Sequence, residues 1–274
     1  MDDFPTKELK IPTILAFFKT LIFTFVSENI ISIMFQSTLA IVLNTVKCSD
    51  KTVIIHLFTK ESGKGSYIIK GVYGKKSALR LSMLQPLSII EVETSNQKSR
   101  DIQYIKEGKT VFVFEDICFN PAKTAISLFI AEVLLRSLRE TEKDEQLFDF
   151  LHKSIALLDN CKAGTANFHL IFLLEFSRYL GFYPNTEDMN EGYYFDLQNG
   201  SFVARQPLHQ HYLSPKWAEI ISGLTKMNYE NLHQYAVSRE QRAEILRWLL
   251  DYYRLHVSDF GKLKSLDVLQ ILFD

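Results

Sequence analysis

Between residues 34 and 115, apolar residues gather in five short runs that are separated by polar, turn-forming segments. The runs cover residues 35–46, 52–58, 66–72, 87–94 and 102–114. They are rich in β-branched and aromatic residues, which favour strands. Five strands in about 80 residues, with a turn roughly every 8–12 residues, predict a small closed barrel of the OB-fold type.

From residue 116 onward the apolar positions follow helical spacing instead. Asn120 and Pro121 form a typical helix start, a capping side chain followed by proline at the first helical position. Ser238 and Gln241 have the spacing of a capping box before another helix. Helices are predicted over residues 120–138, 144–158, 165–180, 214–224, 238–256 and 262–272.

A short hairpin is predicted inside this helical part, at residues 193–203. Asn199 and Gly200 lie there between two apolar runs, and this pair favours a tight turn of the primed type. The predicted fold class is therefore α+β. A five-stranded barrel over residues 34–115 is followed by a mainly helical domain over residues 116–274, with a hairpin insert near residues 192–204.

The most apolar stretch of the chain is residues 11–34, but charged residues interrupt it. Its uncharged runs, residues 11–18 and 20–27, are shorter than the roughly 18–20 residues of a membrane-spanning helix. Acidic residues near the start and the lack of a small-residue cleavage site are not typical of a signal peptide. Three interpretations are open: an accessory helix, a weak membrane anchor, or an upstream extension with Met34 as the true start.

The net charge of −1 hides a division between the two parts of the chain. Residues 34–115 carry 12 Lys and Arg against 7 Asp and Glu, whereas residues 116–274 carry 16 against 21. A basic part next to an acidic part indicates that the basic one binds a polyanion such as a nucleic acid.

The basic residues gather after the third predicted strand and in the loops around the barrel. OB-type barrels bind single strands on the face of strands two and three and with the loops that follow strands one and four. The candidate DNA-binding residues in these places are Lys47, Lys51, Lys64, Lys70, Tyr73, Lys75, Lys76, Arg80, Lys98 and Arg100. The alternative interpretation is a solvated basic surface.

No catalytic motif supports an enzyme. The chain lacks a phosphate-binding loop, a nucleophile elbow and a His-Glu-x-x-His zinc motif. His209 and His211 have no third metal ligand at a telling spacing, so we expect ordinary loop histidines. Cys48, Cys118 and Cys161 are odd in number and far apart, which fits a reducing cytoplasm.

Several short motifs follow one another in the order found in a known family. Residues 40–77 contain a strand that ends in LFT, an E-x-G-K hairpin and a K-G-x-x-x-x-K-S segment. Further motifs are LQPL at residues 84–87, LGFYP at residues 180–184 and LKS at residues 263–265. From about residue 34 to its end, the chain resembles the bacterial RecO family of DNA repair proteins. Members begin shortly before the first strand, so the resemblance favours residues 1–33 as an upstream extension.

The resemblance implies a recombination mediator without catalytic chemistry of its own. Family members bind single- and double-stranded DNA, anneal complementary strands and help load RecA onto DNA coated by single-strand-binding protein (SSB). They work with RecR and often with RecF, in the cytoplasm and at the nucleoid. The helical domain takes the acidic, apolar C-terminal tail of SSB. For this tail we predict Arg136 and Arg139, on charge and position alone; the alternative is an ordinary helix end.

One departure from the family pattern is clear. Many members have a four-cysteine zinc site just after the L-G-[YF]-x-P motif, whereas residues 184–206 contain no cysteine. We therefore expect neither zinc nor another cofactor. The insert must then be held by packing of its aromatic residues, which are Tyr193, Tyr194, Phe195 and Phe202.

Two other functions are open alternatives to the DNA-binding mediator. A protein-only adaptor would use the barrel to bind partners and would have no measurable affinity for DNA. A membrane-tethered protein would use residues 11–34 and would sediment with membranes.

Overall fold

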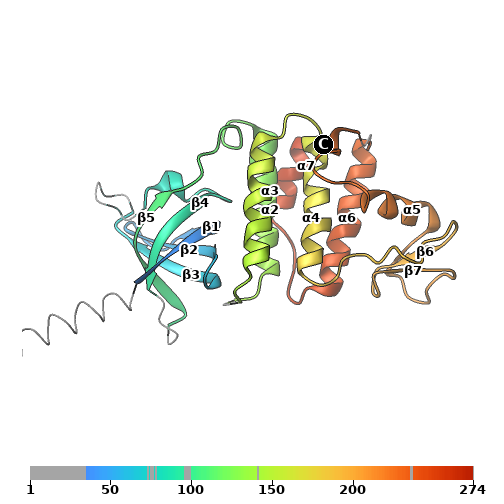
Figure 1. The fold of residues 1–274 in the computed structure, drawn as a ribbon, viewed down its shortest axis with the longest axis horizontal. Coiled ribbons are helices and arrows are strands. Elements are labelled where there is room, and N and C mark those ends of the chain that lie inside the picture. Colours follow the sequence, from blue (N-terminus) through green and yellow to red (C-terminus); the bar gives the residue numbers. More distant parts are fainter. Residues whose placement is uncertain are drawn as a thin grey trace, which may run out of the picture.

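The barrel lies at one end of the molecule, and the small sheet of the helical part lies at the other (Figure 1). This computed structural model describes residues 35–72, 74, 77, 79–95, 100–140, 142–234 and 237–273. The predicted extension over residues 1–33 lies outside them. None of the helices in the described part of the chain has the length and apolar character that a membrane span requires.

Five strands close into a barrel, as the sequence predicts. They are β1 (Phe35–Lys47), β2 (Thr52–Thr59), β3 (Gly63–Lys70), β4 (Ile89–Ser95) and β5 (Ile102–Thr110). The order around the barrel is β1-β2-β3-β5-β4. β3 and β5 run parallel, and the other neighbours are antiparallel. The predicted OB-type barrel is confirmed.

Alternate residues of each strand fill the interior of the barrel. In β2, Val53, Ile55 and Leu57 are buried and point inward, whereas Ile54 and His56 between them are only partly buried and face outward. The inward residues pack against side chains from all four other strands. The β-branched residues that predict strands in the sequence therefore also form the barrel core.

The ends of two strands differ from the prediction. β3 begins earlier, at Gly63, because this residue adopts a φ of 70° in the hairpin turn and packs on the backbone of Glu142. A β-carbon at Gly63 would lie 2.2 Å from the Glu142 carbonyl oxygen, so only glycine fits. β5 ends early, at Thr110, because Phe112 and Phe114 leave the sheet to pack on the core of the helical part.

The helices follow the predicted starts and stops closely. They are α2 (Pro121–Ser137), α3 (Glu145–Asn160), α4 (Phe168–Tyr179), α5 (Pro215–Leu224), α6 (Arg239–His256) and α7 (Ser265–Phe273). Short 3-10 turns are η1 (Leu81–Met83), η2 (Thr165–Asn167) and η3 (Leu232–Gln234). The Asn120 side chain caps α2, and Ser238 and Gln241 form the predicted capping box of α6.

α2 joins the barrel to the other helices. Its residues Ile126, Phe129 and Val133 are fully buried. They belong to one hydrophobic core that also includes Ile41 and Phe58 from the barrel wall. The wall of the barrel on this side is thus covered, whereas β5 lies on the side away from the helices (Figure 1).

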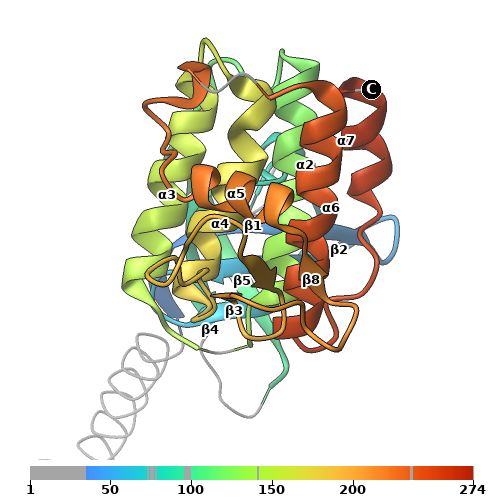
Figure 2. The ribbon, with the colours of Figure 1, turned by 90° about the vertical axis from the view of Figure 1, so that its right-hand side faces the viewer.

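The hairpin insert contains a third strand that the sequence analysis does not predict. β6 (Tyr194–Asp196) pairs with β7 (Ser201–Val203) on one side and β8 (Tyr212–Leu213) on the other. This sheet lies at the end of the molecule that faces the viewer in Figure 2. Phe195 and Phe202 are buried and pack edge to face, with ring centroids 5.0 Å apart. Tyr193 is partly buried against the helical core, and Tyr194 packs on Tyr212.

The prediction of a tight primed turn between β6 and β7 is wrong. Asp196 pairs with Ser201, so the loop consists of residues 197–200. The Asp196 carboxylate accepts hydrogen bonds from the backbone N–H groups of Gln198 and Asn199. These side-chain bonds stabilise the longer loop, which needs no primed turn.

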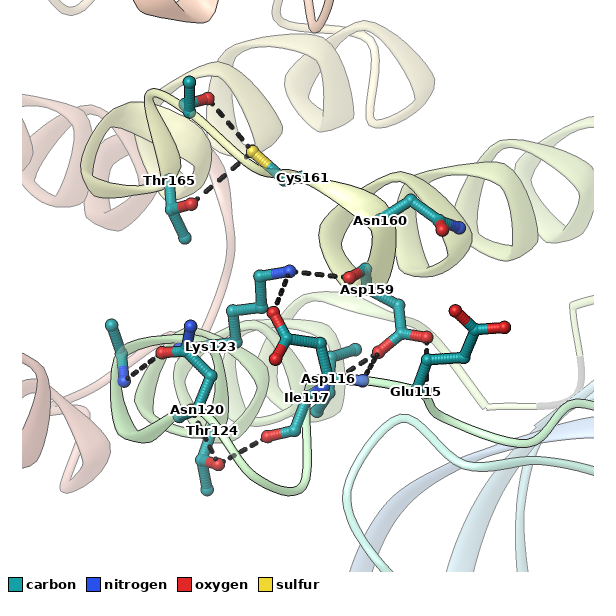
Figure 3. A network of polar contacts seen from close by, with 12 residues as sticks. Glu115, Asp116, Ile117, Asn120, Lys123, Thr124, Asp159, Asn160, Cys161 and Thr165 are labelled. Carbon is teal, nitrogen blue, oxygen red and sulfur yellow. Dashed lines mark hydrogen bonds and ion pairs between the residues drawn. The ribbon is translucent and has the colours of Figure 1, made fainter.

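A buried carboxylate ties the linker between the barrel and α2 to the helices (Figure 3). Asp159 of α3 is 1% exposed and accepts hydrogen bonds of 2.8–2.9 Å from the backbone of Glu115, Asp116 and Ile117. The equally buried Lys123 ammonium donates to the Asp159 carbonyl oxygen at 2.6 Å. It also lies 2.8 Å from the Asp116 carboxylate, whose pKa this hydrogen bond lowers. We call these five residues the linker clasp.

Candidate nucleic-acid interface

A row of apolar side chains crosses the outer face of the barrel from β1 to β5. The strand register places Val46 opposite Ile54, Ile54 opposite Ile68, and Ile68 beside Tyr104. Because these residues alternate with the interior ones, their side chains point outward. Val46 is 44% and Tyr104 39% exposed, so both ends of the row are open to solvent.

Two cations flank the exposed ring of Tyr104. The Lys70 ammonium, at the end of β3, lies 5.6 Å from the ring centroid. The Arg100 guanidinium, just before β5, lies 5.5 Å from the same centroid. Parallel pairing of β3 with β5 brings the two cations to one place. An aromatic ring between cations is the combination that binds unpaired bases together with their phosphates.

Two lysines of β5 are paired with acidic residues. Lys106 lies 2.7 Å from Glu93, and Lys109 lies 2.8 Å from Glu91. These ion pairs neutralise the surface over β4 and β5. In contrast, some basic residues make no ion pair with any described residue, namely Lys51, Lys70, Arg80 and Arg100. Among the described residues of the barrel, positive charge without an acidic partner is therefore found in this group.

The turn between β1 and β2 lies next to Gly71, near the start of residues 70–80, which we call the basic segment. The Lys51 carbonyl oxygen accepts a hydrogen bond of 2.6 Å from the backbone N–H of Gly71. Lys51 and Lys70 therefore lie at the same end of the outer face. Lys47, at the end of β1, is exposed and forms an ion pair of 3.1 Å with Asp50.

Buried apolar residues anchor the basic segment at both ends. Val72 is 4% and Leu79 1% exposed, and both belong to the barrel interior. Gly108 makes room for Leu79, because a β-carbon at Gly108 would lie 2.6 Å from a Leu79 methyl carbon. Arg80 follows Leu79 and is exposed. Four other predicted residues lie outside the described residues, namely Tyr73, Lys75 and Lys76 of this segment and Lys98 after β4.

Lys64 lies apart from the other candidate residues. Its ammonium donates a hydrogen bond of 3.2 Å to the carbonyl oxygen of Leu135, near the end of α2. Burial lowers the pKa of Lys64, although the nearby Glu140 carboxylate opposes this shift. The tip of the β2–β3 hairpin thus enters the junction with the helices, which turns Lys64 away from the row that ends at Tyr104.

A cleft of about 490 Å³ opens at this junction. Arg136 and Arg139, the residues predicted for the SSB tail, both line it together with Lys64. The buried Ser137 hydroxyl also lines it and makes no hydrogen bond with a described residue. Apolar and acidic residues complete the walls, among them Phe58, Leu138, Glu140, Glu142, Asp144, Leu180 and Phe182.

Tyr104 is the main site residue that the sequence interpretation missed. The predicted fifth strand contains it, and alternation places Ile102 and Tyr104 on one face. Whether that face meets the basic end of β3 depends on the parallel pairing of β3 with β5, which strand patterns do not show. The sequence therefore indicates on which face of its strand Tyr104 lies, but not which residues of other strands lie beside it.

Residues 184–206 of the insert include no cysteine. His209 lies 3.4 Å from Asp196, and the rings of His209 and His211 have centroids 6.2 Å apart. In the described part of the chain, no three His, Cys, Asp or Glu side chains are arranged to hold a metal ion.

The fold and its outer face define a class of protein in which an OB-type barrel with a basic, partly apolar face is joined to a helical domain. Two family models match the two parts of the chain. The model of the N-terminal part of recombination protein O matches residues 34–114, and the model of its C-terminal part matches residues 118–267. The chain belongs to the RecO family of DNA repair and recombination proteins.

Curated relatives agree with this assignment. The DNA repair protein RecO of Phocaeicola vulgatus is 44% identical over 240 residues, which cover 88% of this chain and 100% of the relative. That of Bacteroides fragilis is 42% identical over 242 residues, with the same coverage. That of Porphyromonas gingivalis is 34% identical over 239 residues, 86% of this chain and 98% of the relative. The family resemblance seen in the sequence is confirmed.

Proposed function

We propose that this chain is a recombination mediator that binds single- and double-stranded DNA, anneals complementary strands and helps load RecA onto SSB-coated DNA. The observation that supports this most is the exposed Tyr104 ring between Lys70 and Arg100, on the barrel of a RecO family member. OB-type barrels hold single strands by stacking bases on aromatic rings and by placing cations against phosphates.

The protein would bind DNA mainly through the phosphate backbone, so its affinity would not depend on the base sequence. Lys51, Lys70, Arg80 and Arg100 make no ion pair with a described residue, so their charges are available to phosphates. Each such contact releases counterions from the DNA, which makes binding sensitive to salt. A strand held mainly by its backbone keeps its base edges open for pairing, which is what annealing requires. This action needs neither a nucleophile nor a cofactor, and we propose none.

We also propose that the acidic, apolar C-terminal tail of SSB binds in the junction cleft. Arg136 and Arg139 line it and would pair with carboxylates of the tail. Leu138, Leu180 and Phe182 in its walls would contact apolar residues of the tail. RecR and, in many members, RecF stay predicted partners, and the nucleoid stays the predicted location.

The proposed function is tested by the annealing of two complementary, fluorescently labelled oligonucleotides that are coated with SSB. We expect the full chain to raise the rate of duplex formation well above the rate with SSB alone, because it holds both strands by their backbones. No acceleration, together with no binding to either DNA form, would leave the protein-only adaptor as the better interpretation.

The tail proposal is tested by binding of a peptide with the SSB tail sequence to the double variant Arg136→Ala, Arg139→Ala. We expect an affinity loss of about 10-fold or more, because each charge-assisted hydrogen bond contributes roughly 1.5–3 kcal/mol. The matched control is Arg247→Ala, Arg254→Ala, which removes two exposed arginines from α6. Equal affinities of the two double variants for the peptide would place the tail elsewhere.

A further inference from the structure

Tyr104 presents a flat aromatic ring on the outer face of the barrel, where a planar base could lie on it. Ile68, its partner in the register, and Ile102, two residues before it in β5, also face outward, and Ile102 is 39% exposed. An open hollow of about 610 Å³ beside the ring is lined by Ile68, Lys70 and Ser77 among others. This volume is within the range of roughly 300–1,000 Å³ of small-ligand sites. Lys106 and Glu107 also line it, so the hollow combines apolar and charged side chains and is roomy enough for a base.

The two cations lie over this ring at the ends of long, exposed side chains, so a stacked base would take the place of a cation. Lys70 and Arg100 lie 5.6 and 5.5 Å from the ring centroid, farther than the roughly 3.5–4.0 Å of atoms in contact. A base in contact with the ring would displace a cation from the ring face, which the flexible side chain permits. The Lys70 and Arg100 cations would then lie near the phosphates of the stacked nucleotide and would attract their negative charge.

Single and double strands differ in what they offer this ring. The phosphates of both forms can reach the cations. In a duplex, however, each base is covered on both faces by its neighbours, so a ring can stack on it only if the base is pulled out of the stack, which costs free energy. In a single strand the flat faces of the bases are accessible, so the bases can stack on aromatic side chains.

We propose that Tyr104 makes this face prefer single-stranded over double-stranded DNA, whereas the cations serve both forms alike. The inference rests on the proposed DNA-binding function and deepens it, because it assigns the choice of DNA form to one residue. Strand preference would aid a mediator, since it would leave the protein on the exposed strand and release the duplex once annealing is complete.

The test measures the affinity of the full chain, wild type and Tyr104→Leu, for a labelled single-stranded oligonucleotide and for the same sequence as a duplex. We expect Tyr104→Leu to lose about 10-fold in single-strand affinity, the size of one lost base–aromatic stack. Duplex affinity should stay within about 2-fold, which also shows that the variant is folded. The salt dependence should not change, because no phosphate contact is lost.

Two further variants sharpen this test. Tyr104→Phe keeps the ring and should bind single strands like the wild type. Phe119→Ala removes a ring that is 81% exposed on the linker, outside the barrel face, and should bind both forms normally. If the wild type binds neither form, both the proposed function and this inference are wrong. If it binds both, and Tyr104→Leu weakens both equally or neither, only this inference is overturned.

Discussion

Replacing Lys70, Arg80 and Arg100 together with alanine is expected to weaken single-strand binding roughly 100-fold at low salt. Among the described residues these side chains have no ion-pair partner, so their full charge acts on phosphates. Each single-strand phosphate contact contributes about 0.7 to the slope of log affinity against log salt. The triple variant should therefore have a slope that is shallower by about 2. Fluorescence anisotropy at several salt concentrations measures both quantities.

The control for this variant removes the same charge away from the face around Tyr104. Lys60, Lys109 and Lys143 are paired with acidic residues at 3.2, 2.8 and 3.0 Å. Their triple replacement by alanine should change the affinity by less than about 3-fold and leave the slope unchanged. If both triple variants weaken binding equally, net charge governs the affinity, and the outer face around Tyr104 has no special role.

Replacing Asp159 with alanine is expected to lower the free energy of unfolding by about 3–5 kcal/mol, the largest stability effect that we predict. The change leaves three backbone N–H groups of the linker without an acceptor, next to the buried Lys123 ammonium. Each buried donor that loses its partner costs roughly 1–3 kcal/mol. Asp159→Asn keeps one acceptor oxygen and should lose less. Urea unfolding followed by tryptophan fluorescence measures these differences.

The same helix provides the control for Asp159. Asp149 is also in α3, but its side chain is 56% exposed and pairs with Lys60 on the surface. Asp149→Ala should lower the free energy of unfolding by about 1 kcal/mol or less, as exposed ion pairs do. An Asp159→Ala variant no less stable than Asp149→Ala would contradict the structural role of the linker clasp.

The elements of this fold are predictable because local signals agree with the tertiary structure. In the barrel, inward residues such as Val53 and Ile55 alternate with outward ones, and this alternation predicts the strands. Asn120 and Ser238 predict helix starts because their side chains accept backbone hydrogen bonds that depend only on local sequence. The family motifs add the order of the elements.

The features that were missed depend on contacts between distant segments. Tyr104 meets Lys70 only through the parallel pairing of β3 with β5. Lys64 was predicted for the DNA face, yet the close packing of the hairpin tip on the backbone after α2 turns it toward the helices. Asp159 is separated by more than 40 residues from the linker that it holds. No local pattern reveals such pairs, so they emerge only in the folded chain.

The central claim, that the barrel binds single-stranded DNA, is tested most directly by fluorescence anisotropy of a labelled single-stranded oligonucleotide titrated with the wild-type chain. The titration is made at low and at physiological salt. We predict saturable binding at low salt that weakens steeply as salt rises, because phosphate contacts release counterions. Flat titrations at both salt concentrations would contradict the claim and would make the basic face of the barrel an ordinary solvated surface.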